Sequence, residues 1–247
     1  MHHHFSIKNN LLNLWQKLAQ DSGWKTLEKD ALLCLKPPIK FPWLNMSWGI
    51  ITQEELQIVQ KFFKDKSFCL MIEQNARVNF DLLQKFFDPE LETEMHINLS
   101  HSQNFTQPPH ITFKKVSTLR DFKLFVQTSS TIFSIPHDDM YKFMHPIRTH
   151  SCAFLAFIKK ECVGTAQFYL DDYGFAGLQT IGVLEPYRQR GIAKALTQLC
   201  LSIAQKSGAK SAGLSASEQG VKLYGHLQFS PVKYWKIQIS RLRIFEP

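Results

Sequence analysis

The stretch Glu185-Pro186-Tyr187-Arg188-Gln189-Arg190-Gly191-Ile192-Ala193 decides the fold of the second half of this chain. It follows an expected strand, Phe175 to Leu184, and precedes a segment whose apolar residues recur at helical spacing. A strand that ends in a basic, glycine-bearing loop and opens a helix directs free backbone N–H groups and the positive helix end at one point. Gly191 keeps side chains away from that point, while Arg188 and Arg190 add positive charge. The pattern predicts a pyrophosphate cradle.

A second motif lies downstream, where residues 214–229 read LSASEQGVKLYGHLQF. The two motifs together resemble the GNAT superfamily of acyl-CoA-dependent N-acyltransferases. The loop matches the family's (Arg/Gln)-x-x-Gly-x-(Gly/Ala) signature at Arg188, Gly191 and Ala193, and LYGHLQF is similar to its LYxxLGF tract. The resemblance covers about residues 111–245. It implies a mixed α/β fold around a central sheet, acetyl-CoA as co-substrate, no metal, and transfer of an acetyl group to an amine by direct attack on the thioester.

The resemblance also implies roles for individual residues. Those it places around the cofactor are Ile181, Gly182, Val183, Arg188, Gln189, Arg190, Gly191, Ile192, Ala193 and Ser217. Backbone N–H groups of residues 181–183 would stabilise the oxyanion. Ser217 stands where many members have a cofactor-contacting asparagine, and a serine there can also be the N-cap of the next helix. Tyr224 would protonate the departing thiolate; the alternative is a core tyrosine at helical spacing with Val221 and Leu227.

The sequence marks no general base. Gly177 stands near the position where some relatives have a catalytic glutamate, and the nearby Asp171, Asp172 and Glu185 are typical of turns and loops in water. The amine would therefore lose its proton through ordered water or arrive partly neutral. This departure keeps a second hypothesis open, a catalytically silent acyl-CoA-binding or interaction module. The segment at residues 137–139 (HDD) either borders the acceptor, as in the family, or begins an exposed helix.

A polar, proline-bearing stretch, SHSQNFTQPPH at residues 100–110, divides the chain into an N-terminal α/β half (1–105) and a catalytic domain (111–247). In the first half, apolar spacing predicts a helix around residues 11–18, and the Thr52–Glu55 capping box predicts another that begins near Gln53. Short tracts such as PWLNMSWG resemble the truncated N-terminal half of two-part GNAT proteins. The chain would then hold two tandem GNAT-like halves, the first degenerate.

Smaller segments complete the expected α/β order. The first half should contain strands at residues 67–73 and 95–99 and a short helix at 80–87. The second should contain a strand at 111–116, a helix capped by Ser117, and strands at 153–158 and 162–170. This alternation is typical of a mixed sheet with helices packed on it.

Composition and charge limit the other function classes. Apolar residues make up 44% of the chain and charged residues 20%, which is typical of a folded globular protein, and the net charge of +8 permits an anionic partner. We expect no nucleic-acid partner, because the chain has no block of five Lys or Arg, no zinc-ligand spacing and no RNA-recognition signature. The five cysteines show no CxxC spacing and predict reduced core thiols.

The remaining expectations concern location and partners. The chain has no apolar run of 18 residues and no secretory h-region at its start, which predicts a cytoplasmic protein without a membrane partner. The acceptor stays open between a small-molecule amine and a peptide N-terminus, because a cofactor motif does not fix the acceptor. The assembly stays open between a monomer and a homodimer.

Overall fold

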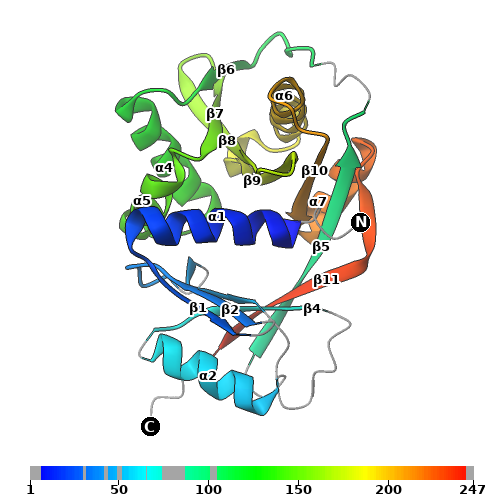
Figure 1. The fold of residues 1–247 in the computed structure, drawn as a ribbon. Coiled ribbons are helices and arrows are strands. Elements are labelled where there is room, and N and C mark those ends of the chain that lie inside the picture. The colour runs from blue at the N-terminus through cyan, green and yellow to red at the C-terminus, as the bar shows by residue number, and fades with distance from the viewer. Residues whose placement is uncertain are drawn as a thin grey trace.

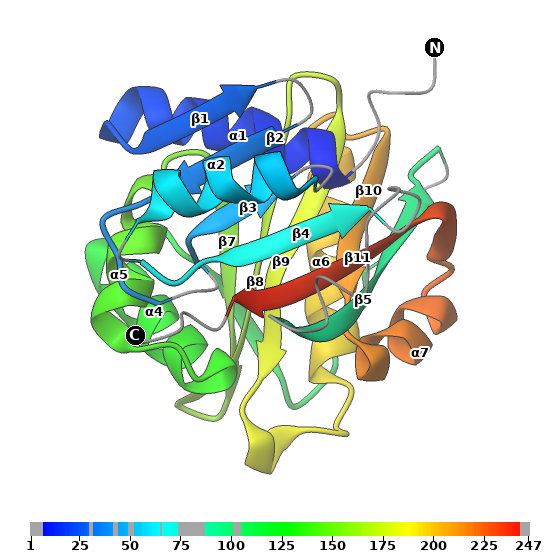
Figure 2. The ribbon, with the colours of Figure 1, turned by 90° about the horizontal axis from the view of Figure 1, so that it is seen from below.

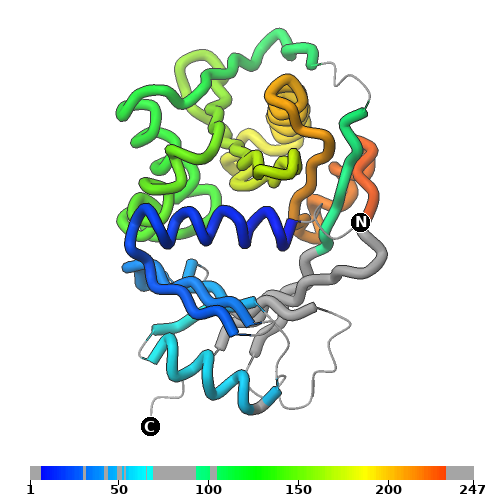
Figure 3. The backbone as a smooth tube through the Cα atoms, viewed as in Figure 1, coloured from blue at the N-terminus to red at the C-terminus, as the bar shows by residue number. Residues whose placement is uncertain are grey.

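The computed structural model describes residues 7–29, 32–41, 44–48, 52–64, 66–73, 87–100 and 105–242 (Figure 3). The helices are α1 (Ile7–Ser22), α2 (Gln53–Phe63), α4 (Leu119–Phe133), α5 (His137–Ile147), α6 (Ile192–Lys206) and α7 (Glu218–His226), with a 3-10 turn η2 (Glu185–Tyr187). The strands are β1 (Lys25–Lys29), β2 (Leu32–Lys36), β3 (Met46–Trp48), β4 (Cys69–Glu73), β5 (Phe87–Asn98), β6 (Thr112–Lys115), β7 (Ser151–Ile158), β8 (Glu161–Leu170), β9 (Phe175–Val183), β10 (Ser211–Ala216) and β11 (Ser230–Leu242).

The described strands form one mixed sheet, which confirms the expected α/β fold. The strand order is β1-β2-β3-β4-β11-β5-β10-β9-β8-β7-β6 (Figure 1, Figure 2). Neighbouring strands are antiparallel except for two parallel pairs, β3 with β4 and β9 with β10. The second parallel pair is the one that shapes the candidate site.

At the centre of the sheet, strands that precede residues 100–110 in the sequence alternate with strands that follow them. β5 precedes this stretch, yet it lies between β10 and β11 and pairs antiparallel with both. β11 is the last of the described strands, yet it lies between β5 and β4. The sheet is therefore continuous across the boundary that the sequence suggests.

Local sequence signals account for most helix starts. Thr52 caps α2 and forms the expected capping box with Glu55, which confirms that prediction. The cap predicted for α4 at Ser117 is wrong by one residue: the N-cap is Thr118, whose hydroxyl accepts the backbone N–H of Asp121 (3.1 Å). Asp121 completes a capping box by accepting the N–H of Thr118 (3.3 Å). The short helix predicted at 80–87 lies outside the described residues except for its last residue, which begins β5.

Alternating side chains of the central strands face two separate cores. On β7, Leu155 faces the core that includes α1, α4 and α5, whereas Phe154 and Ala156 face the core that includes α6 and α7. On β2, Leu33 faces the first of these cores, and Cys34 faces a third, smaller core against α2. The sheet thus has helices on both faces, as an α/β fold with largely apolar strands requires.

Helix α1 lies between two groups of strands, with β1, β2 and β4 on one side and β7, β8, β9 and β10 on the other (Figure 1). Its buried residues Trp15 and Leu18 share one core with Leu33 of β2 and with Leu155 and Tyr169 of β7 and β8. A helix that is buried toward both groups ties them into one packing unit. None of the described helices is both long and apolar enough to cross a membrane.

The described cysteines behave as core or half-buried residues. The four whose side chains are described are free thiols, and Cys34 and Cys200 are fully buried. Burial raises the pKa of both thiols, so both are protonated at neutral pH.

A buried amide anchors α1 to the hairpin of β8 and β9. The side-chain amide of Asn10 donates to the carbonyl oxygens of Tyr169 (3.2 Å) and Phe175 (3.0 Å) and to a carboxylate oxygen of Asp171 (3.2 Å). A Cβ atom added at Gly177 of β9 would lie 2.0 Å from the Asn10 Oδ1 atom. Asn10 therefore occupies the space that a side chain at position 177 would need.

We expect Gly177→Ala to destabilise the protein by about 1–3 kcal/mol, the usual cost of overpacking, because the Asn10 amide must move. Asn10→Ala removes the obstacle, so the double variant should cost less than the sum of the two single variants. Urea unfolding of the four proteins measures this coupling. Gly225→Ala is the control: a Cβ there meets no atom within 4 Å, and alanine in helix α7 should be neutral or stabilise the protein by up to about 1 kcal/mol. Additive costs would contradict the contact.

Candidate functional site

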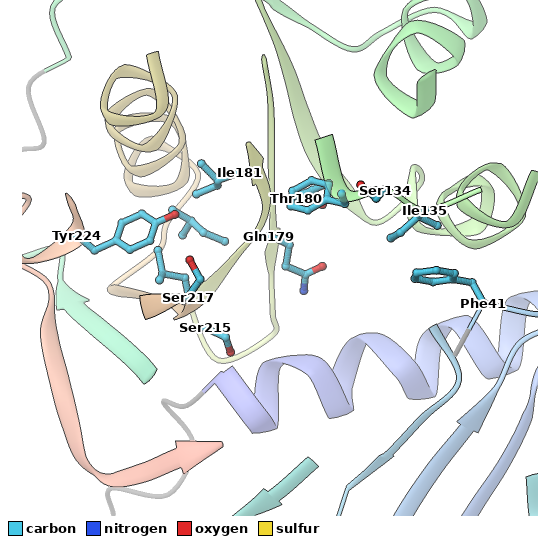
Figure 4. A pocket seen from close by; sticks show the side chains of 12 residues that line it. Phe41, Ser134, Ile135, Gln179, Thr180, Ile181, Ser215, Ser217 and Tyr224 are labelled. Carbon is cyan, nitrogen blue, oxygen red and sulfur yellow. The ribbon is translucent and has the colours of Figure 1, made fainter. Parts of the chain in front are cut away.

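Strands β9 and β10 separate along their length and leave a cavity between them. Their parallel pairing covers only residues 175–177 and 211–213, after which β10 continues to pair with β5 alone. The cavity has a volume of about 670 Å³ (Figure 4). Its lining residues are Phe41, Phe133, Ser134, Ile135, Leu178, Gln179, Thr180, Ile181, Leu214, Ser215, Ser217 and Tyr224. This volume is within the usual range for a small-ligand site.

A β-bulge in β9 accompanies the separation. The pairing with β8 shifts between Thr165, which faces Gly182, and Gln167, which faces Gln179, so β9 has one extra residue here. Thr180 lies in the bulge with a φ of +55°, a left-handed conformation that is rare for a β-branched residue. Such strain persists only where surrounding contacts fix it, and it is common at functional sites.

Two buried hydroxyls hold the bulge from behind. The Thr165 hydroxyl donates to the carbonyl oxygen of Thr180 (3.0 Å) and accepts from the Ser129 hydroxyl of α4 (3.2 Å). Both hydroxyl-bearing residues are completely buried. The sequence does not predict these two hydrogen bonds, because the three residues are far apart along the sequence and isolated Ser and Thr residues have no characteristic pattern.

The loop after β9 presents free backbone donors, as its sequence suggests. Gln189 and Gly191 both have positive φ values, +62° and +76°, and Gly191 is the N-cap of α6 without a capping side chain. Among the described residues, none accepts a hydrogen bond from the backbone N–H groups of residues 189–193. Exposed N–H groups at a helix N-terminus are suited to bind a phosphate-like anion. This loop therefore fits the diphosphate of a nucleotide cofactor.

The two loop arginines fold back against the loop in this structure. Arg188 donates from Nε to the carbonyl oxygen of Val183 (3.3 Å). Arg190 donates to the carbonyl oxygen of Pro186 (3.2 Å) and lies over the Tyr187 ring, 5.2 Å from its centroid. Both side chains are exposed, so they add positive charge around the free N–H groups.

The three residues expected to stabilise an oxyanion lie in different surroundings. Ile181 lines the cavity. Gly182 is covered by α4, since a Cβ there would lie 2.4 Å from Ile132 Cγ2. Leu184 donates its N–H to Val163 of β8 (2.9 Å), so strand alternation directs the N–H of Val183 to the opposite edge, toward the gap.

Tyr224 lies in α7 with its ring against the second core and its hydroxyl toward the cavity (Figure 4). The residue is 8% exposed and its ring contacts Phe229 edge to face, with centroids 5.7 Å apart. None of the described residues forms a hydrogen bond with its hydroxyl. Burial raises the pKa of Tyr224 to about 12, and the nearby Cys200 adds to this shift. The phenol is therefore a protonated, unpaired donor at the cavity wall.

Ser217 is the N-cap of α7 and also lies at the cavity wall. Its hydroxyl caps α7 by accepting the N–H of Gly220 (3.3 Å), and the same residue lines the cavity. A hydroxyl that accepts one hydrogen bond can still donate its own proton to a ligand. The structure thus brings Ile181, Ser217 and Tyr224 around one cavity, with the loop of residues 188–193 beyond the end of β9.

Comparison with known proteins agrees with this geometry. Residues 122–229 match the model of the Acetyltransferase (GNAT) family. This part of the chain therefore resembles a GNAT acetyltransferase domain. An 86-residue segment is 38% identical to the N-alpha-acetyltransferase MAK3 of Arabidopsis thaliana, covering 32% of this chain and 45% of the relative. The chain therefore spans less than half the length of that curated relative.

Solved structures extend the likeness of fold to both halves. The GCN5-related N-acetyltransferase from Kribbella flavida matches with a TM-score of 0.72 at 13% identity, covering 98% of this chain and 96% of its own. The one from Sphaerobacter thermophilus gives 0.64 at 15% identity, covering 98% and 93%. A tandem GNAT protein from the clavulanic acid biosynthesis pathway gives 0.58 at 10% identity, covering 98% and 96%.

The two aspartates in the turn between β8 and β9 serve the fold. Asp171 is a turn residue, but it is buried rather than in water: it accepts the N–H groups of Tyr173 (3.0 Å) and Phe175 (2.9 Å). Asp172 is exposed and pairs with Lys17 (3.0 Å). None of the described residues that line the cavity is an aspartate or glutamate. Within the described ranges, no three His, Cys, Asp or Glu side chains are arranged to hold a metal ion.

Asp139 links α5 to the first half of the chain. The HDD segment at residues 137–139 begins α5, and the Asp139 carboxylate accepts the backbone N–H groups of Lys40 (3.2 Å) and Phe41 (2.9 Å). Phe41 in turn lines the cavity. The segment therefore begins a helix and also fixes a first-half loop at the cavity wall.

We expect Thr165→Val to destabilise the protein by about 1–3 kcal/mol, because it leaves the Thr180 carbonyl and the Ser129 hydroxyl buried without their partner. Thr165→Ser should retain most of the stability, since it keeps the hydroxyl. Thr197→Val is a matched control: Thr197 is equally buried, but its hydroxyl donates only to Ala193 of its own helix (2.8 Å). Thermal unfolding compares the variants, and equal losses at positions 165 and 197 would contradict a special role for the hydroxyl chain.

Proposed function

We propose that this protein is an N-acetyltransferase that moves an acetyl group from acetyl-CoA to an amine, either a small molecule or a peptide N-terminus. The observation that carries the proposal is the gap between β9 and β10, which has the free N–H groups of the GNAT loop beyond one end and the unpaired Tyr224 hydroxyl in its wall. The similarity to the Arabidopsis N-alpha-acetyltransferase favours an α-amino group as acceptor.

In this proposal each group of residues has a separate task. Residues 188–193 bind the diphosphate of coenzyme A through backbone N–H groups and positive charge. Ser217 contacts the pantetheine arm, and the backbone N–H of Val183, which is directed to the gap, faces the thioester carbonyl. When the amine nitrogen attacks this carbonyl, this N–H group stabilises the oxyanion. Tyr224 donates its proton to the sulfur as the carbon–sulfur bond breaks, and it regains a proton from solvent.

The amine loses its proton without a carboxylate from the described cavity wall. A wall without carboxylates offers the charged ammonium form no counter-ion in place of its hydration, so entry into the cavity lowers the pKa of the amine. The attacking nitrogen is then neutral, and its released proton leaves through water. The acetylation rate should therefore rise with pH until the bound amine is fully neutral.

A catalytically silent acyl-CoA-binding module is the second candidate. The observation that favours it is the lack of a carboxylate among the described residues that line the cavity. Release of free thiol from acetyl-CoA in the presence of amines separates the two candidates, since only the enzyme releases it.

The proposal extends to the surroundings of the protein. We propose that it acts in the cytoplasm as a monomer or homodimer, without a nucleic-acid or membrane partner, and that residues 1–105 serve as a degenerate GNAT-like half beside the catalytic residues 111–247. The match to a tandem GNAT protein over 98% of this chain supports that division.

We expect acetyl-CoA to raise the unfolding temperature, because a ligand bound only by the folded state adds about 2.7 kcal/mol at 100 times its dissociation constant. Gly191→Val should abolish most of this shift. A Cβ there meets no atom within 4 Å, so the loss arises from the φ of +76° and not from a clash. Gly191→Asn, which tolerates this conformation, should retain more of the shift. If millimolar acetyl-CoA does not raise the unfolding temperature of the wild-type protein, the proposal is contradicted.

We expect Tyr224→Phe to lower kcat by about 100-fold, the lower end of the range for loss of a general acid. The ring and its packing remain, so the KM for acetyl-CoA should change little. Because the pKa of Tyr224 is raised to about 12, the hydroxyl stays protonated in the usual assay range, and the wild-type rate should not fall as the pH rises from 7 to 10. Tyr169→Phe, outside the cavity, is the control. Wild-type turnover in Tyr224→Phe would assign the residue to the core.

A further inference from the structure

A second cavity lies on the α1 side of the bulge, between the first half of the chain and the GNAT domain. Its volume is about 230 Å³. Leu11, Leu14 and Trp15 of α1 form one wall, and Phe143 and Met144 of α5 form another. A cavity of about 150 Å³ lined by apolar side chains can bind benzene, so this one has room for a branched alkyl group or an aromatic ring.

This apolar cavity adjoins the cavity between β9 and β10. Both are lined by Phe133, Ile135, Gln179 and Thr180. The shared residues lie away from Tyr224: Figure 4 shows Tyr224 on one side of the larger cavity, Ile135 on the other, and Gln179 between them. A group in the apolar cavity would thus lie on the side of the reaction centre that is remote from the leaving sulfur.

Gln179 leaves a polar atom unsatisfied at this junction. Its side-chain Nε2 is buried, and none of the described residues accepts a hydrogen bond from it. A buried donor without a partner is costly, so a ligand carbonyl that accepts from it would gain affinity. Gln179 lines both cavities, which places this donor between the apolar cavity and the reaction centre.

The residues that line the two cavities offer no charged group to recognise an acceptor. Tyr224 is the single titratable residue among the described residues that line either cavity, and none of them carries a charge at neutral pH. An acceptor with a carboxylate, a phosphate or several ammonium groups near the reacting amine would find no counter-ion there and would lose its hydration. An uncharged, apolar neighbour to the amine suits these walls.

We propose that the apolar cavity is the acceptor subsite and that the acceptor is an α-amino amide with an apolar side chain. Its amine reaches the thioester, its carbonyl accepts from Gln179 Nε2, and its side chain enters the cavity that α1 completes. Free amino-acid amides and peptide N-termini share this chemistry. The inference rests on the proposed function and gives the first half a defined role, since α1 provides one wall of the subsite.

The test is a series of acceptors assayed with acetyl-CoA and the full chain. We expect kcat/KM for leucinamide and phenylalaninamide to exceed that for glycinamide and lysinamide by about tenfold or more. A Leu-Gly-Gly peptide that exceeds leucinamide identifies a peptide N-terminus as the source; the reverse identifies a free amide. Transfer without an apolar preference would overturn this inference alone, whereas acetyl-CoA binding without transfer to any amine would overturn the proposed function.

Two variants locate the preference in the structure. Leu11→Phe narrows the apolar cavity and should lower kcat/KM for leucinamide about tenfold more than for glycinamide, whose continued acetylation shows that the variant is folded. Leu12→Phe is the matched control, because Leu12 is a half-buried neighbour on α1 that lines neither cavity. A loss that is equal in Leu11→Phe and Leu12→Phe, or equal for both acceptors, would contradict the subsite.

Two further arms separate carbonyl recognition and acyl-chain binding. Gln179→Leu should lower kcat/KM for leucinamide but not for 3-methylbutylamine, which has the same alkyl chain and no carbonyl.

The apolar cavity could instead hold a longer acyl chain. Isovaleryl-CoA is therefore compared with acetyl-CoA, with glycinamide as acceptor. Faster transfer from isovaleryl-CoA that Leu11→Phe abolishes would overturn the assignment to the acceptor.

Discussion

The separation of β9 and β10 beyond Gly177 and Gly213 is the constraint on which the rest of the site depends. Two parallel strands that stayed paired would leave no room for a ligand between them. Instead, β10 stays paired with β5, and the bulge at Thr180 bends β9 away. The strained backbone of Thr180 is held by the buried hydroxyls of Thr165 and Ser129. The core on the α4 side of the sheet therefore keeps the gap between β9 and β10 open.

The first half of the chain completes this site from the other side. Helix α1 packs against both groups of strands, and Asn10 fills the position where a side chain at 177 would project. Asp139 holds the backbone of Phe41 at the cavity wall. The space that a carboxylate at position 177 would need is therefore occupied by a first-half residue, and the same helix forms a wall of the adjoining apolar cavity.

Local signals made the loop, most helices and the mixed α/β class predictable from sequence. The free N–H groups before α6 follow from a glycine at the helix start, and the Thr52–Glu55 cap follows from its spacing. Non-local features were not predictable: the places of β5 and β11 in the sheet, the contact of Asn10 with Gly177, and the Ser129–Thr165–Thr180 chain all join distant residues. Even a local signal can shift by one residue: the cap expected at Ser117 lies at Thr118, because the backbone geometry selects the cap.

Transfer of an isotopically labelled acetyl group tests the central claim most directly. The full chain would be incubated with acetyl-CoA labelled with carbon-13 in the acetyl group and with a mixture of amines, and the products would be followed by mass spectrometry together with free thiol. We expect labelled acetyl on an amine nitrogen, matched one to one by free coenzyme A. Labelled acetate without an acetylated amine, or no thiol release across the mixture, would contradict it.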